Sequence, residues 1–118
     1  MNEYLILMRL DLITKEEQPS PEQLQVYMKQ YNEWVEKIIS KNQFISGKGL
    51  STEGKVIQSN QVVTDGPFVE IKESLAGFIT IKAETLEEAA LIAKECPILG
   101  GPGNSVEVRQ VVSVHEKE

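Results

Sequence analysis

The chain has few of the residues on which common catalytic and structural sites depend. Its 118 residues include one cysteine, Cys96, and one histidine, His115. A single cysteine excludes an internal disulfide framework and suits a reducing cytoplasm. Neither residue has neighbours with the spacing of metal ligands, and carboxylates alone are a weak metal signal. We therefore expect no metal and no other cofactor.

Basic residues and long hydrophobic runs are scarce as well. Lys and Arg number 12 against 18 Asp and Glu, which gives a net charge of -6. An acidic surface repels phosphate backbones, so a nucleic-acid partner is not expected. No apolar run approaches the roughly 20 residues needed to span a bilayer. Charged residues also interrupt the apolar N-terminal run, which argues against a signal peptide. We expect a soluble cytoplasmic protein.

The pattern of apolar residues predicts one domain over residues 1–118 with alternating strands and helices. Ser20-Pro21-Glu22-Gln23 has the residues of a helix start, with Ser20 as cap and Gln23 completing a capping box. Thr85 and Glu88 form a second such box. We expect strands over residues 4–10, 44–50, 55–63, 76–82 and 106–114, and helices over 21–41 and from 86 to before 97. A turn over 51–54 would join the second and third strands.

This order predicts an α+β, ferredoxin-like sandwich with an extra β-hairpin and both helices on one sheet face. The first strand is apolar on both faces, because Leu5 and Leu7 alternate with Ile6 and Met8. Two helices cannot cover both faces of one sheet. A second copy packed sheet to sheet is the economical cover, so we expect a homodimer.

The strongest candidate site is the turn Asp65-Gly66-Pro67-Phe68. A carboxylate at a turn is able to act as a general acid or base when it is partly desolvated. Phe68 would line a ligand pocket or anchor the turn. The structural alternative is an Asx-turn, in which the Asp65 side chain accepts hydrogen bonds from nearby backbone amides.

Charged residues follow this turn at Glu70, Lys72 and Glu73. In an extended segment Glu70 and Lys72 share one face. Glu70 would then lie near Asp65 and favour a proton on one of the two carboxyls, while Lys72 would contact the ligand. The alternative is a surface ion pair between Glu70 and Lys72, worth about 0–1 kcal/mol.

Three further residues are candidates for ligand binding. Arg9 and Arg109 lie in strands among apolar neighbours, and either guanidinium is able to hold an anion through two hydrogen bonds. A structural salt bridge or a dimer contact is the alternative. Trp34 belongs to the periodic face of the first helix, where it either fills the core or borders a ligand cleft.

The chain resembles the DGPF branch of the YCII-related family along nearly its whole length. The resemblance is carried by Asp65-Gly66-Pro67-Phe68-x-Glu70-x-Lys72-Glu73 followed by Ala76-Gly77-Phe78, with Tyr31, Trp34 and Val106-Glu107-Val108-Arg109 elsewhere. It implies a dimeric α/β barrel. Related barrels catalyse lactone isomerisation and dehydrochlorination, and DGPF proteins often accompany extracytoplasmic-function sigma factors, which implies a sigma factor as a partner.

The resemblance leaves two functions open. The first is an enzyme that acts on a small anionic metabolite by acid–base chemistry at Asp65. The second is a non-catalytic ligand-binding or sigma-factor-associated regulatory module. Other YCII-related proteins carry a His–Asp pair, but no histidine precedes His115 here, so only the aspartate is carried over, to Asp65. A purely architectural turn is the third interpretation.

Overall fold

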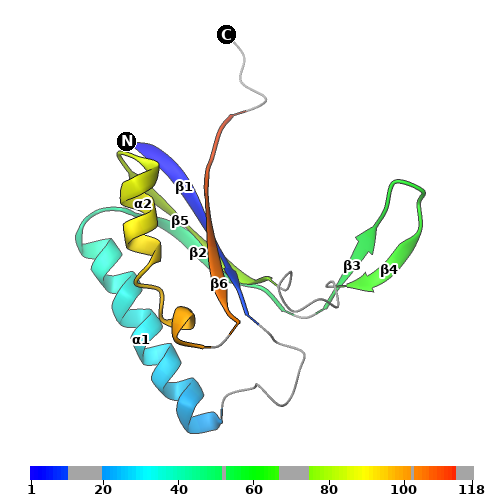
Figure 1. The fold of residues 1–118 in the computed structure, drawn as a ribbon, viewed down its shortest axis with the longest axis horizontal. Helices are drawn as coiled ribbons and strands as arrows, with labels where there is room; N and C mark the ends of the chain where they lie inside the picture. The colour runs from blue at the N-terminus through cyan, green and yellow to red at the C-terminus, as the bar shows by residue number, and fades with distance from the viewer. Residues whose placement is uncertain (11–19, 52, 67–74, 102, 114–118) are drawn as a thin grey trace.

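The chain folds into a four-stranded antiparallel sheet with two helices packed on one of its faces (Figure 1). The computed structural model describes residues 1–10, 20–51, 53–66, 75–101 and 103–113. The sheet contains β1 (Asn2–Arg9), β2 (Phe44–Gly49), β5 (Leu75–Ala83) and β6 (Ser105–Gln110), in the order β2-β5-β1-β6. The remaining elements are α1 (Pro21–Ser40), α2 (Leu86–Ala93), the 3-10 turn η3 (Pro97–Gly100), and the two-stranded sheet of β3 (Gly54–Ile57) with β4 (Val63–Gly66).

The path β1-α1-β2 and then β5-α2-β6 repeats a strand–helix–strand unit. Joined in this antiparallel sheet, the two units make the ferredoxin-like arrangement. The predicted α+β sandwich with an extra hairpin is therefore confirmed. The hairpin β3–β4 is inserted between β2 and β5, and it projects away from the four-stranded sheet (Figure 1).

Helix α1 begins and ends as the sequence predicts. The backbone nitrogen of Ser20 donates to Gln23 Oε1 over 2.9 Å, and the Gln23 nitrogen donates to Ser20 Oγ over 3.2 Å. At the other end, Asn42 takes a left-handed conformation with φ 58°, and the Gln43 nitrogen donates to the Ile38 carbonyl over 3.1 Å. These bonds satisfy backbone groups that the helix itself leaves without partners.

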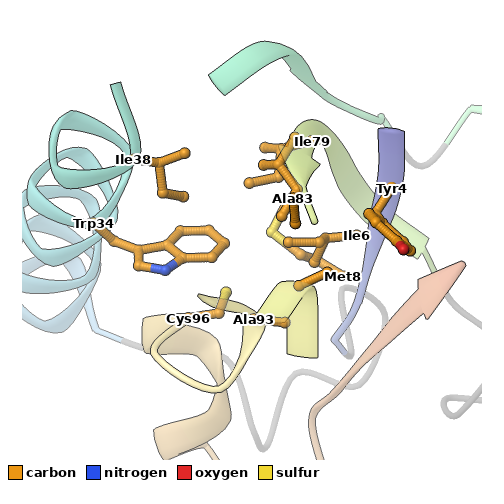
Figure 2. Packing of buried hydrophobic residues seen from close by; sticks show 11 residues of the cluster. Tyr4, Ile6, Met8, Trp34, Ile38, Ile79, Ala83, Ala93 and Cys96 are labelled. Atoms are coloured by element: carbon orange, nitrogen blue, oxygen red, sulfur yellow. The ribbon is translucent and has the colours of Figure 1, made fainter. Parts of the chain in front are cut away.

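The core lies between the helices and one face of the sheet. Ile6 of β1 is paired with Ile79 of β5 and with Val108 of β6, and all three side chains are on the helix side. Figure 2 shows Trp34 and Ile38 of α1 pointing toward these strands. Ala89 and Ala93 of α2 are also buried. Their small side chains let α2 lie close to the sheet.

The other face of the sheet, called the open face below, has no second layer among the described residues. Leu5 and Leu7 point to it, because successive side chains of a strand alternate. Leu7 lies between Phe78 of β5 and Glu107 of β6 in the register. The shortest dimension of the molecule is 19 Å, which accommodates one sheet and one layer of helices.

The predicted partner of β2 is wrong. The sequence predicts a hairpin of residues 44–50 with 55–63, whereas β2 pairs with β5, and β3 pairs with β4. The turn lies at 58–62, where the Val62 nitrogen donates to Asn60 Oδ1 over 3.0 Å and Gln61 has φ 69°. An asparagine that accepts this bond starts a turn, so it divides the segment that we predicted as one strand. Asp65 and Gly66 are the last two residues of β4, and Pro67 and Phe68, the other half of the predicted turn, lie outside the described residues.

Candidate functional site

The described residues hold one cluster of predicted site residues, on the open face where β1 ends. Arg9 is opposite Ser105, Leu7 is opposite Glu107, and Leu5 is opposite Arg109. This register places both arginines and Glu107 on the same side of the sheet. Glu107 Oε1 lies 3.2 Å from Arg9 Nη1, and Glu107 Oε2 lies 3.5 Å from Arg109 Nη1. The structure thus brings together Arg9 and Arg109 through a shared carboxylate.

The two arginines differ in their surroundings. The Arg9 side chain is 25% exposed, whereas that of Arg109 is 70% exposed. Arg9 Nη1 is buried and has no hydrogen-bond partner among the described residues. Its distance to Glu107 Oε1 makes an ion pair, but the N–H groups are not aligned with that oxygen as a hydrogen bond. Arg9 therefore retains a donor for an additional acceptor, and an unsatisfied buried donor costs about 1–3 kcal/mol.

The open face is more basic than the chain as a whole, which has a net charge of -6. The register of the four strands places its charged residues as follows: Arg9, Lys48, Lys82 and Arg109 are basic, and Glu3 and Glu107 are acidic. This excess of positive charge favours an anion over a cation at the described part of the face.

The predicted catalytic residues lie in a different sheet from this cluster or outside the described residues. Asp65 belongs to β4, where its backbone is opposite Lys55 of β3. The hairpin is a sheet of its own (Figure 1). Phe68, Glu70 and Lys72 lie outside the described residues. The expected pairing of Asp65 with Glu70 therefore stays a prediction.

Trp34 is a core residue. Its side chain is buried, and its indole nitrogen donates to the Ile92 carbonyl over 3.0 Å. The ring also lies 5.9 Å from that of Tyr31, at a tilt of 59°. Of the two interpretations open from the sequence, this placement supports core packing, because the polar end of the indole already has a partner.

Glu107 is the member of the cluster that sequence reasoning did not select as a site residue. Glu107 and Arg109 are two positions apart in β6, so their side chains lie on the same face of the strand. The contact of Glu107 with Arg9 depends on the pairing of β1 with β6, which lie far apart in the sequence. Nothing local in the sequence specifies that pairing, so the bridging role of Glu107 becomes visible only in the folded chain.

Two ionisable groups on the helix side of the sheet are shielded from water: Cys96 is buried and Tyr31 is half-buried. Burial raises the pKa of the Cys96 thiol, and a backbone hydrogen bond at Ile98 opposes this in part. Burial also raises the pKa of Tyr31, and the nearby Cys96 adds to that effect. Both groups are neutral when protonated, so the folded state keeps these protons to a higher pH than the unfolded state does.

We expect this difference to make the protein less stable in alkali. Well below about pH 8.5, the usual pKa of a free thiol, both groups are protonated in the folded and unfolded states and neither contributes a pH dependence. As the pH rises further, the unfolded chain ionises first and the free energy of unfolding falls. Denaturant unfolding at pH 7, 9 and 10 measures this fall. Cys96→Ala and Tyr31→Phe should each reduce its slope, and an unchanged slope in both variants would contradict the prediction.

Within the described part of the chain, no three His, Cys, Asp or Glu side chains are grouped so that they could hold a metal ion. None of its helices is long and apolar enough to cross a membrane.

The fold and the cluster define a small ferredoxin-like α+β domain with two arginines around one carboxylate on an open sheet face. The model of the YCII-related domain matches residues 8–115. The chain therefore belongs to the YCII-related family, as its motifs predict.

A comparison with curated proteins finds no match. Among solved structures, the chain is similar to 5-chloro-2-hydroxyhydroquinone dehydrochlorinase (TftG) from Burkholderia phenoliruptrix AC1100, determined in complex with 2,5-dihydroxybenzoquinone. The identity is 19% and the TM-score 0.44, over 98% of this chain and 99% of that chain. A likeness of this degree assigns no activity to the present protein.

Proposed function

We propose that this YCII-related protein is an enzyme that acts on a small anionic metabolite by acid–base chemistry. Arg9 binds the anionic group, and Asp65 transfers the proton. The observation that carries the proposal is the buried Nη1 of Arg9, which has no hydrogen-bond partner among the described residues. A carboxylate or enolate oxygen of a ligand would accept that hydrogen bond and neutralise the excess positive charge.

The proposed chemistry uses these two groups and requires that both face the same bound molecule. Asp65 as a carboxylate accepts a proton from a C–H or O–H group of the bound molecule, and the negative charge that this leaves on the substrate is stabilised by the Arg9 guanidinium. Asp65 then returns the proton to another atom of the substrate or to a leaving group. Glu70 would tune the proton affinity of Asp65 through its like charge.

The test of the binding role is a panel of small carboxylates titrated into the isotopically labelled protein and followed by NMR. Arg9→Gln should weaken binding at least tenfold, because it removes the charge and the buried donor together. Arg109→Gln is the matched control. The Arg109 side chain is 70% exposed, so this variant should lose less affinity for the anion than Arg9→Gln does. Equal losses in the two variants would contradict the assignment of Arg9.

The test of the catalytic role is Asp65→Asn, assayed on whichever ligand the wild-type protein converts. We expect binding to persist and turnover to fall about a hundredfold or more, which is the usual contribution of a general acid or base. Unchanged turnover would exclude Asp65 from the chemistry.

A non-catalytic ligand-binding module is the second candidate. It is favoured by the backbone register that places Asp65 opposite Lys55 in the hairpin, where oppositely charged cross-strand neighbours stabilise a strand pair. Recovery of the bound molecule chemically unchanged after long incubation, together with saturable Arg9-dependent binding, would identify this function.

A second copy of the chain is our proposal for what covers the open face. The half-buried side chains of Leu5, Leu7 and Phe78 form an apolar strip at its centre. Packing two such faces against each other removes all six side chains from water. Light scattering should give twice the mass of the chain for the wild type. Leu7→Glu should give the monomer, and Leu24→Glu, at an exposed position of α1, should stay dimeric.

A further inference from the structure

We propose that Glu107 makes the Arg9 site selective for ligands that carry a single negative charge. This inference rests on the proposed function, in which Arg9 binds an anion, and it names the charge class of that anion. Glu107 is then a specificity-determining residue, because it fixes how much positive charge the cluster offers.

The charge of the cluster follows from its composition. Arginine stays protonated throughout the pH range in which the protein is studied. Two guanidinium groups contact one carboxylate, with Nη1–oxygen distances of 3.2 Å to Arg9 and 3.5 Å to Arg109. The cluster therefore presents one uncompensated positive charge. A monoanion neutralises it, whereas a dianion leaves one negative charge close to the Glu107 carboxylate.

The position of Glu107 is fixed by the sheet. Its backbone is paired with Leu7 in the β1–β6 ladder. Arg109 is two residues away on the same strand, and Arg9 is two residues from Leu7 on the neighbouring strand. Each carboxylate oxygen of Glu107 faces a different guanidinium. To turn away from an incoming dianion, Glu107 would have to give up both ion pairs. The carboxylate therefore stays beside the ligand and repels additional negative charge.

The other charged groups of the described open face are too distant to compensate. Lys48, Phe78, Leu7 and Glu107 form one row across the four strands. Lys48 is consequently about 14 Å from Glu107, which is three strand spacings. At physiological ionic strength, charges separated by more than about 8 Å are largely screened. Glu3 and Lys82 are opposite each other near the other end of β1.

The experiment compares acetate, which carries one charge at pH 7.5, with malonate, which carries two. Both are titrated by NMR into the full-length protein at constant ionic strength, and the ratio of their dissociation constants is the readout. Glu107→Gln removes the repelling charge at nearly constant shape. It should improve malonate affinity relative to acetate about tenfold over the wild-type ratio.

Two further variants complete the design. Glu3→Gln makes the same change of charge on the same face at the other end of β1, and it should leave the ratio unchanged. Glu107→Asp keeps the charge and should keep the wild-type preference for acetate. This control distinguishes the effect of removing the charge from the effect of a folding defect at position 107. A ratio that is unaffected by Glu107→Gln, or that moves equally in Glu3→Gln, overturns the inference.

The failure of the inference is distinguishable from the failure of the proposed function. If acetate binds in an Arg9-dependent way but Glu107→Gln leaves the ratio of the two dissociation constants unchanged, only the charge selectivity is wrong. If Glu107→Gln weakens both anions alike, Glu107 orients Arg9 without selecting charge, which also overturns the inference. If neither anion shows Arg9-dependent binding, the proposed function and this inference fail together.

Discussion

Replacing Trp34 by alanine should lower the free energy of unfolding by about 3–5 kcal/mol, the range found when a large buried aromatic side chain is truncated. Trp34 is 5% exposed, and its ring points from α1 into the core beside Ile38 (Figure 2). The substitution leaves a cavity beside Ile38 and removes the indole hydrogen bond to the Ile92 carbonyl, which is 3.0 Å long. Since Trp34 and Ile38 are the two buried residues of α1, the helix should loosen from the sheet.

Two control variants separate the causes of this loss. Trp34→Phe keeps an aromatic ring but loses the indole hydrogen bond to the Ile92 carbonyl, which still accepts from the Glu95 nitrogen over 3.2 Å. We therefore expect an intermediate loss, of which the missing bond accounts for about 0.5–1.5 kcal/mol. Leu24→Ala truncates a side chain on the same helix that is 51% exposed, and it should change stability by no more than about 0.5 kcal/mol.

The measurement is denaturant unfolding followed by far-UV circular dichroism. Fluorescence would not serve for the comparison, because Trp34 is the only tryptophan in the chain. A loss in Trp34→Ala no larger than that in Leu24→Ala would show that the indole is not a core residue.

The parts of the fold that follow from short-range chemistry were predictable from the sequence. The cap residues Ser20 and Thr85 place the starts of both helices correctly, since each accepts from the backbone nitrogen three positions on. The box at Ser20 is complete, whereas Glu88 Oε1 accepts from the Glu84 nitrogen instead of that of Thr85. The order of strands and helices likewise predicts that both helices cover one face of the sheet. These features depend on local spacing, which any single sequence displays.

Strand pairing was less predictable, because it depends on competition between distant segments. The sequence suggests that β2 pairs with the strand after it, yet β2 pairs with β5. Asn60 and its polar neighbours are typical of a turn, which indicates that the strand predicted over residues 55–63 is divided there. The cluster shows the same limit. Arg9 and Arg109 were individually recognisable, but the carboxylate that joins them depends on the β1–β6 register.

The pairing of β2 with β5 also gives a physical reason for a small residue at Gly77. A Cβ atom at this position would lie 2.7 Å from the Lys48 carbonyl oxygen and 3.2 Å from the Gly49 Cα. Both are backbone atoms of β2, so no side-chain rotation relieves the clash. The only remaining response is for β2, at the edge of the sheet, to move away from β5.

Gly77→Val should therefore lower the free energy of unfolding by about 3 kcal/mol or more, at or above the upper end of the usual cost of overpacking. The matched control is Gly54→Val in β3, where a Cβ atom would meet nothing within 4 Å. Denaturant unfolding measures the loss, and hydrogen exchange should show faster exchange at the Leu50 amide, which donates to the Ala76 carbonyl over 2.8 Å. If the two valine variants are equally stable, close approach of β2 to β5 is not what requires glycine at position 77.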